Sequence, residues 1–280
     1  MSYLNHIRRC NDFTLKGKVE FLIDGERVGY VRDEYVAYLL KSGVFIKESD
    51  AITIASQYKS VQERNSALEL FAKQAFRDGI TNIYMNEPYP VLTNINSDPL
   101  CLVDRSVSTL LGLISFGQHL NGYIKSDDGV KMWIGRRSFT RGYEAGKLDH
   151  IAAGGLPYGI SLRENLQKEC YEEAGMSQEL SSQAICTGVV SYRHEYTLGG
   201  KEDLIYCYDL ELPKDFTPRC TDGEVEEFYL MDIEEVAHIV KTRNDFKLNC
   251  NLVIIDFLIR HGLLDESDKE YIDIVRGLRV

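Results

Sequence analysis

The feature that most constrains the fold is a helix, over residues 162–174, whose start and end are both set by the local sequence. Ser161 and Glu164 have the spacing of a capping box, in which each side chain accepts from the other residue's backbone N–H. Gly175 can adopt the left-handed conformation that ends a helix. The sequence therefore predicts a helix with fixed ends, which can hold side chains in defined positions.

Three glutamates share one face of this helix. Glu169, Glu172 and Glu173 are spaced i, i+3 and i+4, which places them within about one turn. Their charges repel one another, whereas Mg²⁺ binds carboxylate oxygens together with water and phosphate oxygens. A solvated acidic face is the ordinary alternative, because Glu is common on helix surfaces. The Gly154-Gly155 turn before the helix and the Glu-Glu-x-Gly ending favour a metal site.

The stretch from Gly154 to Met176 resembles the Nudix box, Gly-x5-Glu-x7-Arg-Glu-U-x-Glu-Glu-x-Gly-U, in which U is a bulky aliphatic residue. Aligned from its end, the sequence places Lys168 at the arginine, Glu169, Glu172 and Glu173 at the metal-face glutamates, Cys170 and Met176 at the U positions, and Gly175 at the glycine. Two features depart from the pattern. The upstream glutamate is replaced by Ile160 or Ser161, with the spacing to Gly155 one residue short, and Lys168 lacks the bidentate fork of arginine.

The resemblance continues outside the box. Residues 133–137, 146–149 and 153–155 look like the strands and turns before a Nudix box, and residues 222–228 look like the late acidic loop and strand. The whole chain is similar to the Nudix subfamily with an N-terminal DUF4743 domain, which is related to the N-terminal part of some fungal thiamine pyrophosphokinases. The resemblance implies a Nudix α/β/α sandwich with a mixed sheet. It also implies hydrolysis of thiamine diphosphate, or of oxythiamine and oxothiamine diphosphate, to the monophosphate and phosphate with Mg²⁺ or Mn²⁺.

Proline placement predicts the domain boundary. Half of the six prolines fall in residues 88–99, where a fixed φ and a missing donor suit an extended connection. We expect a small α+β domain over residues 1–105 and the Nudix domain over residues 106–280. Asp24-Gly25 predicts a hairpin in the first, and strands interleaved with helices predict an α/β fold with a mixed sheet in the second.

Roles for single residues follow from hydrolysis of a diphosphate. The water that attacks phosphorus needs a general base within hydrogen-bond reach, and Glu224 is the first candidate, Glu226 the second and Glu173 the third. Arg136 and Arg137 could bind the distal phosphate through their guanidinium groups, although only one can face the site if they alternate on a strand. Gly154 and Gly155 complete the substrate-binding candidates.

Charge and hydropathy exclude other classes of function. A net charge of −11 without a Lys/Arg stripe argues against nucleic acid as a partner. No run approaches the roughly 20 apolar residues of a membrane span, and the amino terminus has no secretory pattern, so a cytoplasmic protein is expected. The seven scattered cysteines suggest neither a disulfide framework nor a thiolate zinc site.

Two alternatives stay open. A Nudix hydrolase of ADP-ribose or another nucleoside diphosphate derivative would have the same fold and different pocket residues. A non-catalytic ligand-binding module would explain the missing upstream glutamate and Lys168, but not the intact three-glutamate face. The expected partner is a small-molecule diphosphate, and the sequence leaves open whether the chain forms a homodimer.

Overall fold

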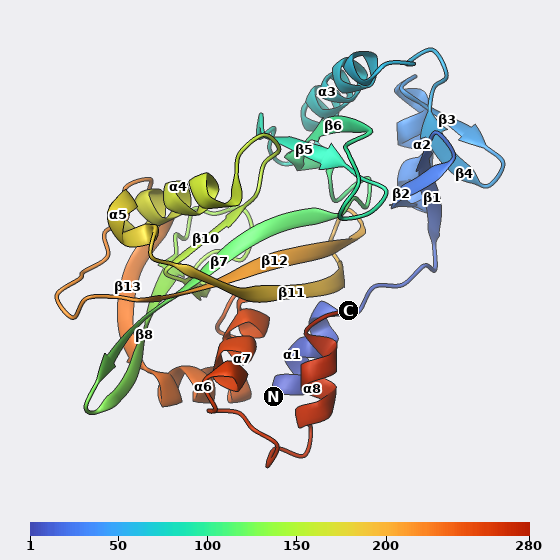
Figure 1. The fold of residues 1–280 in the computed structure, drawn as a ribbon. Helices are drawn as coiled ribbons and strands as arrows, with labels where there is room; N and C mark the ends of the chain where they lie inside the picture. The colour runs from blue at the N-terminus through green and yellow to red at the C-terminus, as the bar shows by residue number, and fades with distance from the viewer.

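Three separate sheets organise the chain in the computed structural model, which describes residues 1–280 (Figure 1). The N-terminal body has a four-stranded sheet in the order β2-β1-β4-β3, covered by helices, and a β5–β6 hairpin. Its elements are β1 (Lys18–Ile23), β2 (Glu26–Arg32), α2 (Asp33–Lys41), β3 (Phe45–Glu48), β4 (Ala51–Ile54), α3 (Val61–Arg77), β5 (Pro88–Val91), β6 (Cys101–Asp104) and the 3₁₀ helix η1 (Arg105–Val107).

Local signals set the elements of this N-terminal body. Asp24 and Gly25 both have positive φ, at 54° and 84°, which is the two-residue hairpin turn that the sequence predicts between β1 and β2. Helix α3 begins with the capping box of Ser60 and Glu63. Its apolar face packs on the sheet, where Phe71 contacts a neighbouring ring edge-on at 4.9 Å between centroids.

The C-terminal body is built on a seven-stranded mixed sheet with the main order β11-β12-β7-β8-β13. β7 and β12 are parallel, while the other pairs are antiparallel. Its elements are β7 (Ser115–Ser126), β8 (Gly129–Arg137), β9 (Leu148–His150), β10 (Ala152–Gly155), α4 (Leu162–Ala174), α5 (Gln178–Ser181), β11 (Ile185–Glu195), β12 (Gly200–Glu211), β13 (Val225–Asp232), α6 (Ile233–Thr242), α7 (Cys250–Arg260) and α8 (Tyr271–Gly277). The predicted α/β class with a mixed sheet between helices is confirmed.

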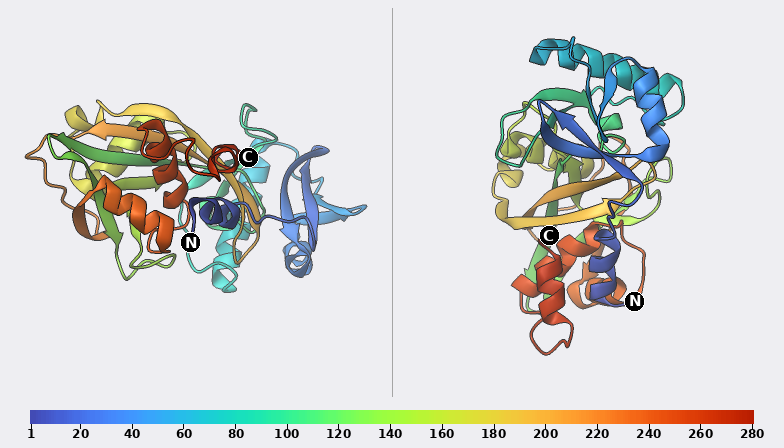
Figure 2. Two further views of the ribbon diagram at one scale, coloured as in Figure 1. Left: turned by 90° about the horizontal axis from the view of Figure 1, so that it is seen from below. Right: turned by 90° about the vertical axis from the view of Figure 1, so that its right-hand side faces the viewer.

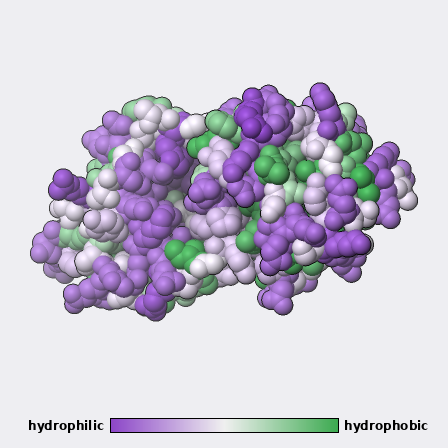
Figure 3. Space-filling model, turned by 90° about the horizontal axis from the view of Figure 1, so that it is seen from above, coloured by the Kyte–Doolittle hydropathy of each residue, from purple (hydrophilic) through white to green (hydrophobic).

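Helices cover the two faces of this sheet unequally (Figures 1 and 2). α4 packs on one face through Leu166, Cys170 and Ala174. α6 and α7 pack on the other, in the largest apolar cluster of the chain. None of the helices combines the length and the hydropathy that crossing a bilayer requires. Seen from the side of α3 and α4, most of the surface is hydrophilic, and apolar residues form scattered patches (Figure 3).

The first helix, α1 (Tyr3–Cys10), lies against the C-terminal helices and not in the N-terminal body (Figure 2). Tyr3, Leu4 and Ile7 are buried in the same apolar cluster as α6, α7 and α8. The chain therefore starts in the C-terminal body, crosses to the N-terminal body and returns at β7. The domain boundary at residue 105 stays a prediction. The structure shows in addition that α1 packs with the C-terminal body.

Candidate active site

Helix α4 begins and ends where the sequence predicts. Ser161 Oγ accepts from the Glu164 N–H at 3.2 Å, and Glu164 Oε2 accepts from the Ser161 N–H at 3.1 Å. Gly175 has a φ of +65° and ends the helix. A Cβ at Gly175 would lie 2.8 Å from the carbonyl oxygen of Arg219, so the glycine also lets a later loop approach. The position of the acidic face is thus fixed at both helix ends.

Two of the three predicted metal ligands reach the strand that precedes α4. Glu173 is buried, and its Oε2 accepts a hydrogen bond from the Ala153 N–H at 2.7 Å. The Glu169 carboxylate lies so close to Gly154 that a Cβ there would be 2.2 Å from its Cδ. Glu172 is the outer member of the set, with 37% of its side chain exposed. The turn before the helix and the helix itself therefore form one site.

A positive charge already sits between two of these carboxylates. Lys168 Nζ lies 3.1 Å from Glu169 Oε1 and 2.9 Å from Glu172 Oε2. A divalent cation at this position would replace one ammonium with a larger charge and with directed oxygen coordination. The residues present therefore fit a hard cation.

Burial of the acidic face makes its charge costly without a cation. Burial, and then the neighbouring Asp149 carboxylate, raise the pKa of Glu173 well above its usual range. Burial also raises the pKa of Glu169, against the lowering effect of Lys168, and Glu172 adds to the rise. A bound cation would reverse both shifts by stabilising the ionised forms.

The loop that carries Glu224 is tied to the end of α4. The Thr221 N–H donates to the Glu172 carbonyl at 2.8 Å, and the Arg219 N–H donates to the Ala174 carbonyl at 3.0 Å. Glu224 forms an ion pair with Arg141 and contributes to the raised pKa of Glu169. The structure thus brings the first base candidate near the acidic face.

The second base candidate differs, because Glu226 is exposed on β13. The role of general base stays a prediction for both residues.

Arg136 and Arg137 point to opposite sides of β8, as alternation along a strand requires. Arg137 is buried and donates from Nη1 to Asp149 Oδ2 at 2.8 Å. Arg136 donates from Nε to the Tyr229 hydroxyl and from Nη1 to the Gly146 carbonyl, each at 2.9 Å. Both guanidinium groups are therefore engaged within the protein, and their phosphate roles stay predictions.

A third arginine, which the sequence analysis did not single out, reaches the turn from the N-terminal body. A Cβ at Gly155 would lie 2.7 Å from Arg105 Cζ and 2.3 Å from the Tyr89 hydroxyl. Arg105 Nη1 donates to Glu87 Oε2 at 2.8 Å. Burial opposes the charge of Arg105, but Tyr89, Glu87 and then Glu169 raise its pKa. No local signal marks Arg105, because only tertiary structure brings η1 to the Gly154-Gly155 turn.

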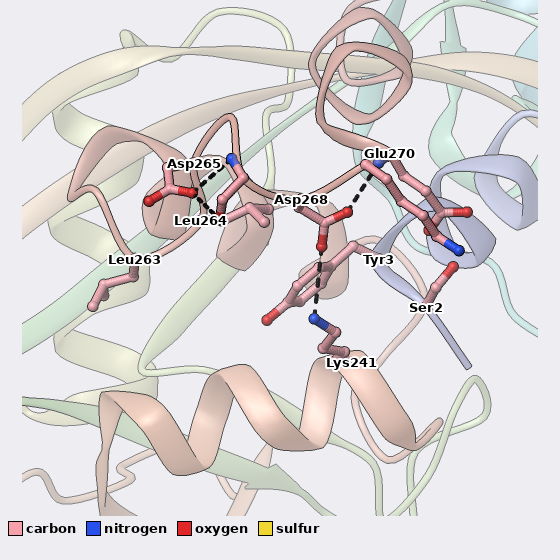
Figure 4. Close-up of a pocket in the computed structure, with 10 residues that line it drawn as sticks. Ser2, Tyr3, Lys241, Leu263, Leu264, Asp265, Asp268 and Glu270 are labelled. Atoms are coloured by element: carbon pink, nitrogen blue, oxygen red, sulfur yellow. Dashed lines mark hydrogen bonds and ion pairs between the residues drawn. The ribbon is translucent and has the colours of Figure 1, made fainter.

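A surface pocket formed by the terminal helices lies away from this site (Figure 4). It has a volume of about 590 Å³ and is lined by residues of α1, the end of α6 and the α7–α8 connection, among them Tyr3, Lys241 and Asp268. It includes none of the predicted site residues, so it belongs to the contact between the terminal helices.

Comparisons with known proteins match both the N-terminal segment and nearly the whole chain. A domain of unknown function, DUF4743, matches residues 2–115. Nudix hydrolase 24, chloroplastic, of Arabidopsis thaliana is 39% identical over 282 residues, covering 99% of this chain and 77% of its own. Nudix hydrolase 20, chloroplastic, of the same plant is 37% identical, with the same coverage of each chain. Among solved structures, a C. elegans Ap4A hydrolase matches at 13% identity and a TM-score of 0.39, covering 54% of this chain and 99% of that one.

Identity at this level, over nearly the whole chain, identifies the family. The capped helix α4, with three carboxylates on one face, lies within the matched length of both relatives. The chain belongs to the Nudix hydrolase family and is a Nudix diphosphohydrolase.

Proposed function

We propose that the chain hydrolyses the diphosphate of a small organic substrate with Mg²⁺, or Mn²⁺, held by Glu169, Glu172 and Glu173. The observation that carries the proposal is the Lys168 ammonium bridging Glu169 and Glu172 beside the Gly154-Gly155 turn. When bound, the metal ion would supply charge for the phosphate oxygens and lower the pKa of a coordinated water.

The protein's own groups would position and activate the attacking water. Glu224 is our candidate general base, because its loop is hydrogen-bonded to the end of α4. The ion pair with Arg141 would hold its carboxylate in one orientation. Glu226 and Glu173 remain the alternatives, in that order.

Arg105 is our candidate for binding the substrate's phosphate. The chain has a net charge of −11, so a phosphate needs a local positive charge to approach the acidic helix. Arg105 lies at the Gly155 backbone, and its guanidinium can bind two phosphate oxygens at once. Glu87, its present partner, would then be exchanged for the substrate. Gly154 and Gly155 would contribute by having no side chain that blocks this approach.

Thiamine diphosphate and its oxidised analogues, oxythiamine and oxothiamine diphosphate, are the substrate class we propose. The resemblance to the DUF4743-containing subfamily supports this choice, and Tyr89 offers an aromatic group next to Arg105. A cytoplasmic location and a homodimer likewise stay predictions.

Hydrolysis of a substrate panel tests the proposal. Phosphate release from thiamine diphosphate, oxythiamine diphosphate and ADP-ribose is measured with the full chain, with and without Mg²⁺. We expect Mg²⁺-dependent release that is fastest for one of the thiamine compounds. Preference for ADP-ribose would support the nucleotide alternative, and binding without turnover of any compound would support the non-catalytic module.

Charge-neutral variants test the metal site separately from the substrate. Glu172→Gln and Glu173→Gln should abolish turnover and weaken Mn²⁺ binding, read from the electron paramagnetic resonance signal of free Mn²⁺. Glu179→Gln, at an exposed position on α5, is the matched control and should change neither. Unchanged turnover and Mn²⁺ binding in both site variants would refute the metal assignment.

A further inference from the structure

Four potential metal ligands meet in the interior of the C-terminal body. They are His119 on β7, Asp149 and His150 on β9, and Cys250 at the first position of α7. All four are buried, and one ligand atom from each lies within 4.8 Å of the others. The cluster shares no residue with the three-glutamate face on α4, although Asp149 neighbours Glu173.

The ligand atoms point toward one another. His119 Nδ1 and His150 Nδ1 are 2.9 Å apart, and Cys250 Sγ is 2.7 Å from Asp149 Oδ1 and 3.9 Å from His119 Nδ1. Tetrahedral zinc, with bonds of about 2.0–2.3 Å, separates its ligand atoms by roughly 3.3–3.7 Å. Two of these separations are shorter than this range and one is longer, and none in the cluster exceeds 4.8 Å, so a zinc ion needs only a small adjustment of the side chains.

The second oxygen of Asp149 faces away from the ligand cluster. Oδ2 accepts from Arg137 Nη1 at 2.8 Å and from Lys247 Nζ at 3.1 Å. These contacts leave Oδ1 directed at Cys250 and fix the rotation of the carboxylate. Ligating carboxylates in proteins are commonly oriented in this way by hydrogen bonds to their other oxygen.

Three of the four groups are in the protonation state that a metal ion requires. Burial lowers the pKa of His119 well below its usual range and that of His150 to about 4, so both imidazoles are neutral near pH 7. Burial opposes ionisation of Asp149, but Lys247 and the other neighbouring cations hold its pKa well below its usual range. Only the Cys250 thiol, whose pKa burial raises, would have to lose its proton.

We propose that His119, Asp149, His150 and Cys250 form a closed site for a divalent transition-metal ion, with Zn²⁺ as the best fit. Two imidazole nitrogens, a thiolate and a carboxylate are ligands that zinc accepts and that Mg²⁺ does not prefer. Binding forms the sulfur–metal bond and releases the thiol proton to solvent. With four protein ligands no coordination position remains open, so the site is structural and joins β7, β9 and α7.

The metal-free alternative is a hydrogen-bonded cluster. One imidazole would donate from Nδ1 to the other, the Cys250 thiol would donate to Asp149, and Arg137 and Lys247 would balance the carboxylate. His150 Nε2 is buried without a partner in this arrangement and would stay so with a metal ion on Nδ1. The two arrangements differ in metal content, which can be measured directly.

Metal content of the purified full chain tests the proposal. After expression with added zinc and dialysis against a chelator, mass spectrometry of the metal should find about one zinc ion per chain. Protein expressed with Co²⁺ instead should show the near-ultraviolet charge-transfer band of a cobalt–thiolate bond and the visible bands of tetrahedral cobalt. A carboxylate site on α4 cannot produce the thiolate band, so this result is independent of the proposed function.

Variants assign the metal to the cluster. Cys250→Ser and His119→Gln should each lower the retained zinc tenfold or more. Cys207→Ser, at another fully buried free cysteine, should retain zinc and the cobalt–thiolate band. A wild-type chain without stoichiometric zinc and without that band would overturn the proposal, whether or not the variants fold. Retention of zinc in folded Cys250→Ser would overturn it as well.

Discussion

Glu172 and Glu173 are adjacent on α4, but their surroundings differ. Glu172 is partly exposed and pairs with Lys168, whereas Glu173 is buried beneath β10. Ionising the buried Glu173 costs free energy of desolvation, and the proposed function needs this carboxylate to be ionised. A site that is useful only with its metal ion is therefore expected to reduce stability without it.

Replacing Glu173 with glutamine should stabilise the metal-free chain. Burial raises the pKa of Glu173 in the folded state, so the folded chain holds the proton more tightly than the unfolded chain does. The contribution of this protonated carboxyl to stability is fully present below the unfolded pKa near 4.5 and is lost as pH rises through the folded pKa. At pH 7 the neutral amide of the variant avoids this loss, and its oxygen can still accept from the Ala153 N–H.

The midpoint of urea unfolding in a chelator should therefore rise for Glu173→Gln at pH 7, and the gain should vanish below pH 4.5. Glu172→Gln, at the partly exposed position, is the control and should show no comparable gain. A Glu173→Gln midpoint at or below that of the wild type would contradict the prediction.

Arg105 should matter for substrate binding. If it binds a phosphate, Arg105→Ala should raise KM by about 10–100-fold, because charge-assisted hydrogen bonds contribute about 1.5–3 kcal/mol. Steady-state kinetics on the preferred substrate measures the change. Arg77→Ala, on α3 of the same body, is the control and should leave KM unchanged. An unchanged KM in Arg105→Ala would leave Arg105 with only its Glu87 contact.

Among the elements, those with local signals were predictable and those held by distant partners were not. The Ser161 capping box and Gly175 predicted α4 over its full length. β7 was not predicted, because its buried Gln118, His119 and Asn121 resemble polar surface in the sequence. Asn121 Nδ2, for example, donates to Asp209 on β12 at 2.9 Å, a partner that only the folded sheet provides.

The candidate site divides in the same way. The three glutamates were predictable, because a helix fixes their relative positions from spacing alone. Arg105 was not, because it reaches the Gly154-Gly155 turn from another body of the protein. The ion pair of Arg137 with Asp149 joins β8 to β9, and the spacing of residues in the sequence does not predict such a pair either.

The end of α4 provides a prediction at this scale. Gly175→Ala should lower the free energy of unfolding by about 1–2 kcal/mol for the left-handed backbone alone, and further because its Cβ would meet the Arg219 carbonyl. Gly159 also has a positive φ, but a Cβ at this position would meet nothing within 4 Å, so Gly159→Ala is the control for the backbone effect alone. Denaturant unfolding should therefore show a larger loss for Gly175→Ala, and an equal loss in the two variants would count against a specific helix–loop contact.

At the scale of the whole molecule, α1 connects the two ends of the chain. His6 Nε2 lies 2.7 Å from the Val240 carbonyl, and Asn11 donates to the Gly277 carbonyl. A Cβ at Gly277 would be 2.1 Å from Ile7 Cγ2, so α1 and α8 pack in close contact. The C-terminal body is therefore incomplete without the first eleven residues.

Ile7→Ala should destabilise the chain by about 2–5 kcal/mol, since it leaves a cavity among α1, α7 and α8. Chemical denaturation measures the change. Leu15→Ala, at a residue that is 58% exposed, is the matched control and should stay within about 0.5 kcal/mol of the wild type. If Ile7→Ala were equally mild, the docking of α1 would not contribute to stability.

This arrangement has a consequence for synthesis on the ribosome. The residues that meet at the contact of His6 with Val240 are separated by 234 positions. Translation proceeds at about 5–20 residues per second, so roughly 12–50 s pass between the synthesis of α1 and that of its partner in α6. The intervening N-terminal sheet can close during that time, while α1 stays exposed with its apolar face uncovered. Chaperones that shield nascent chains would find a long-lived target at this helix.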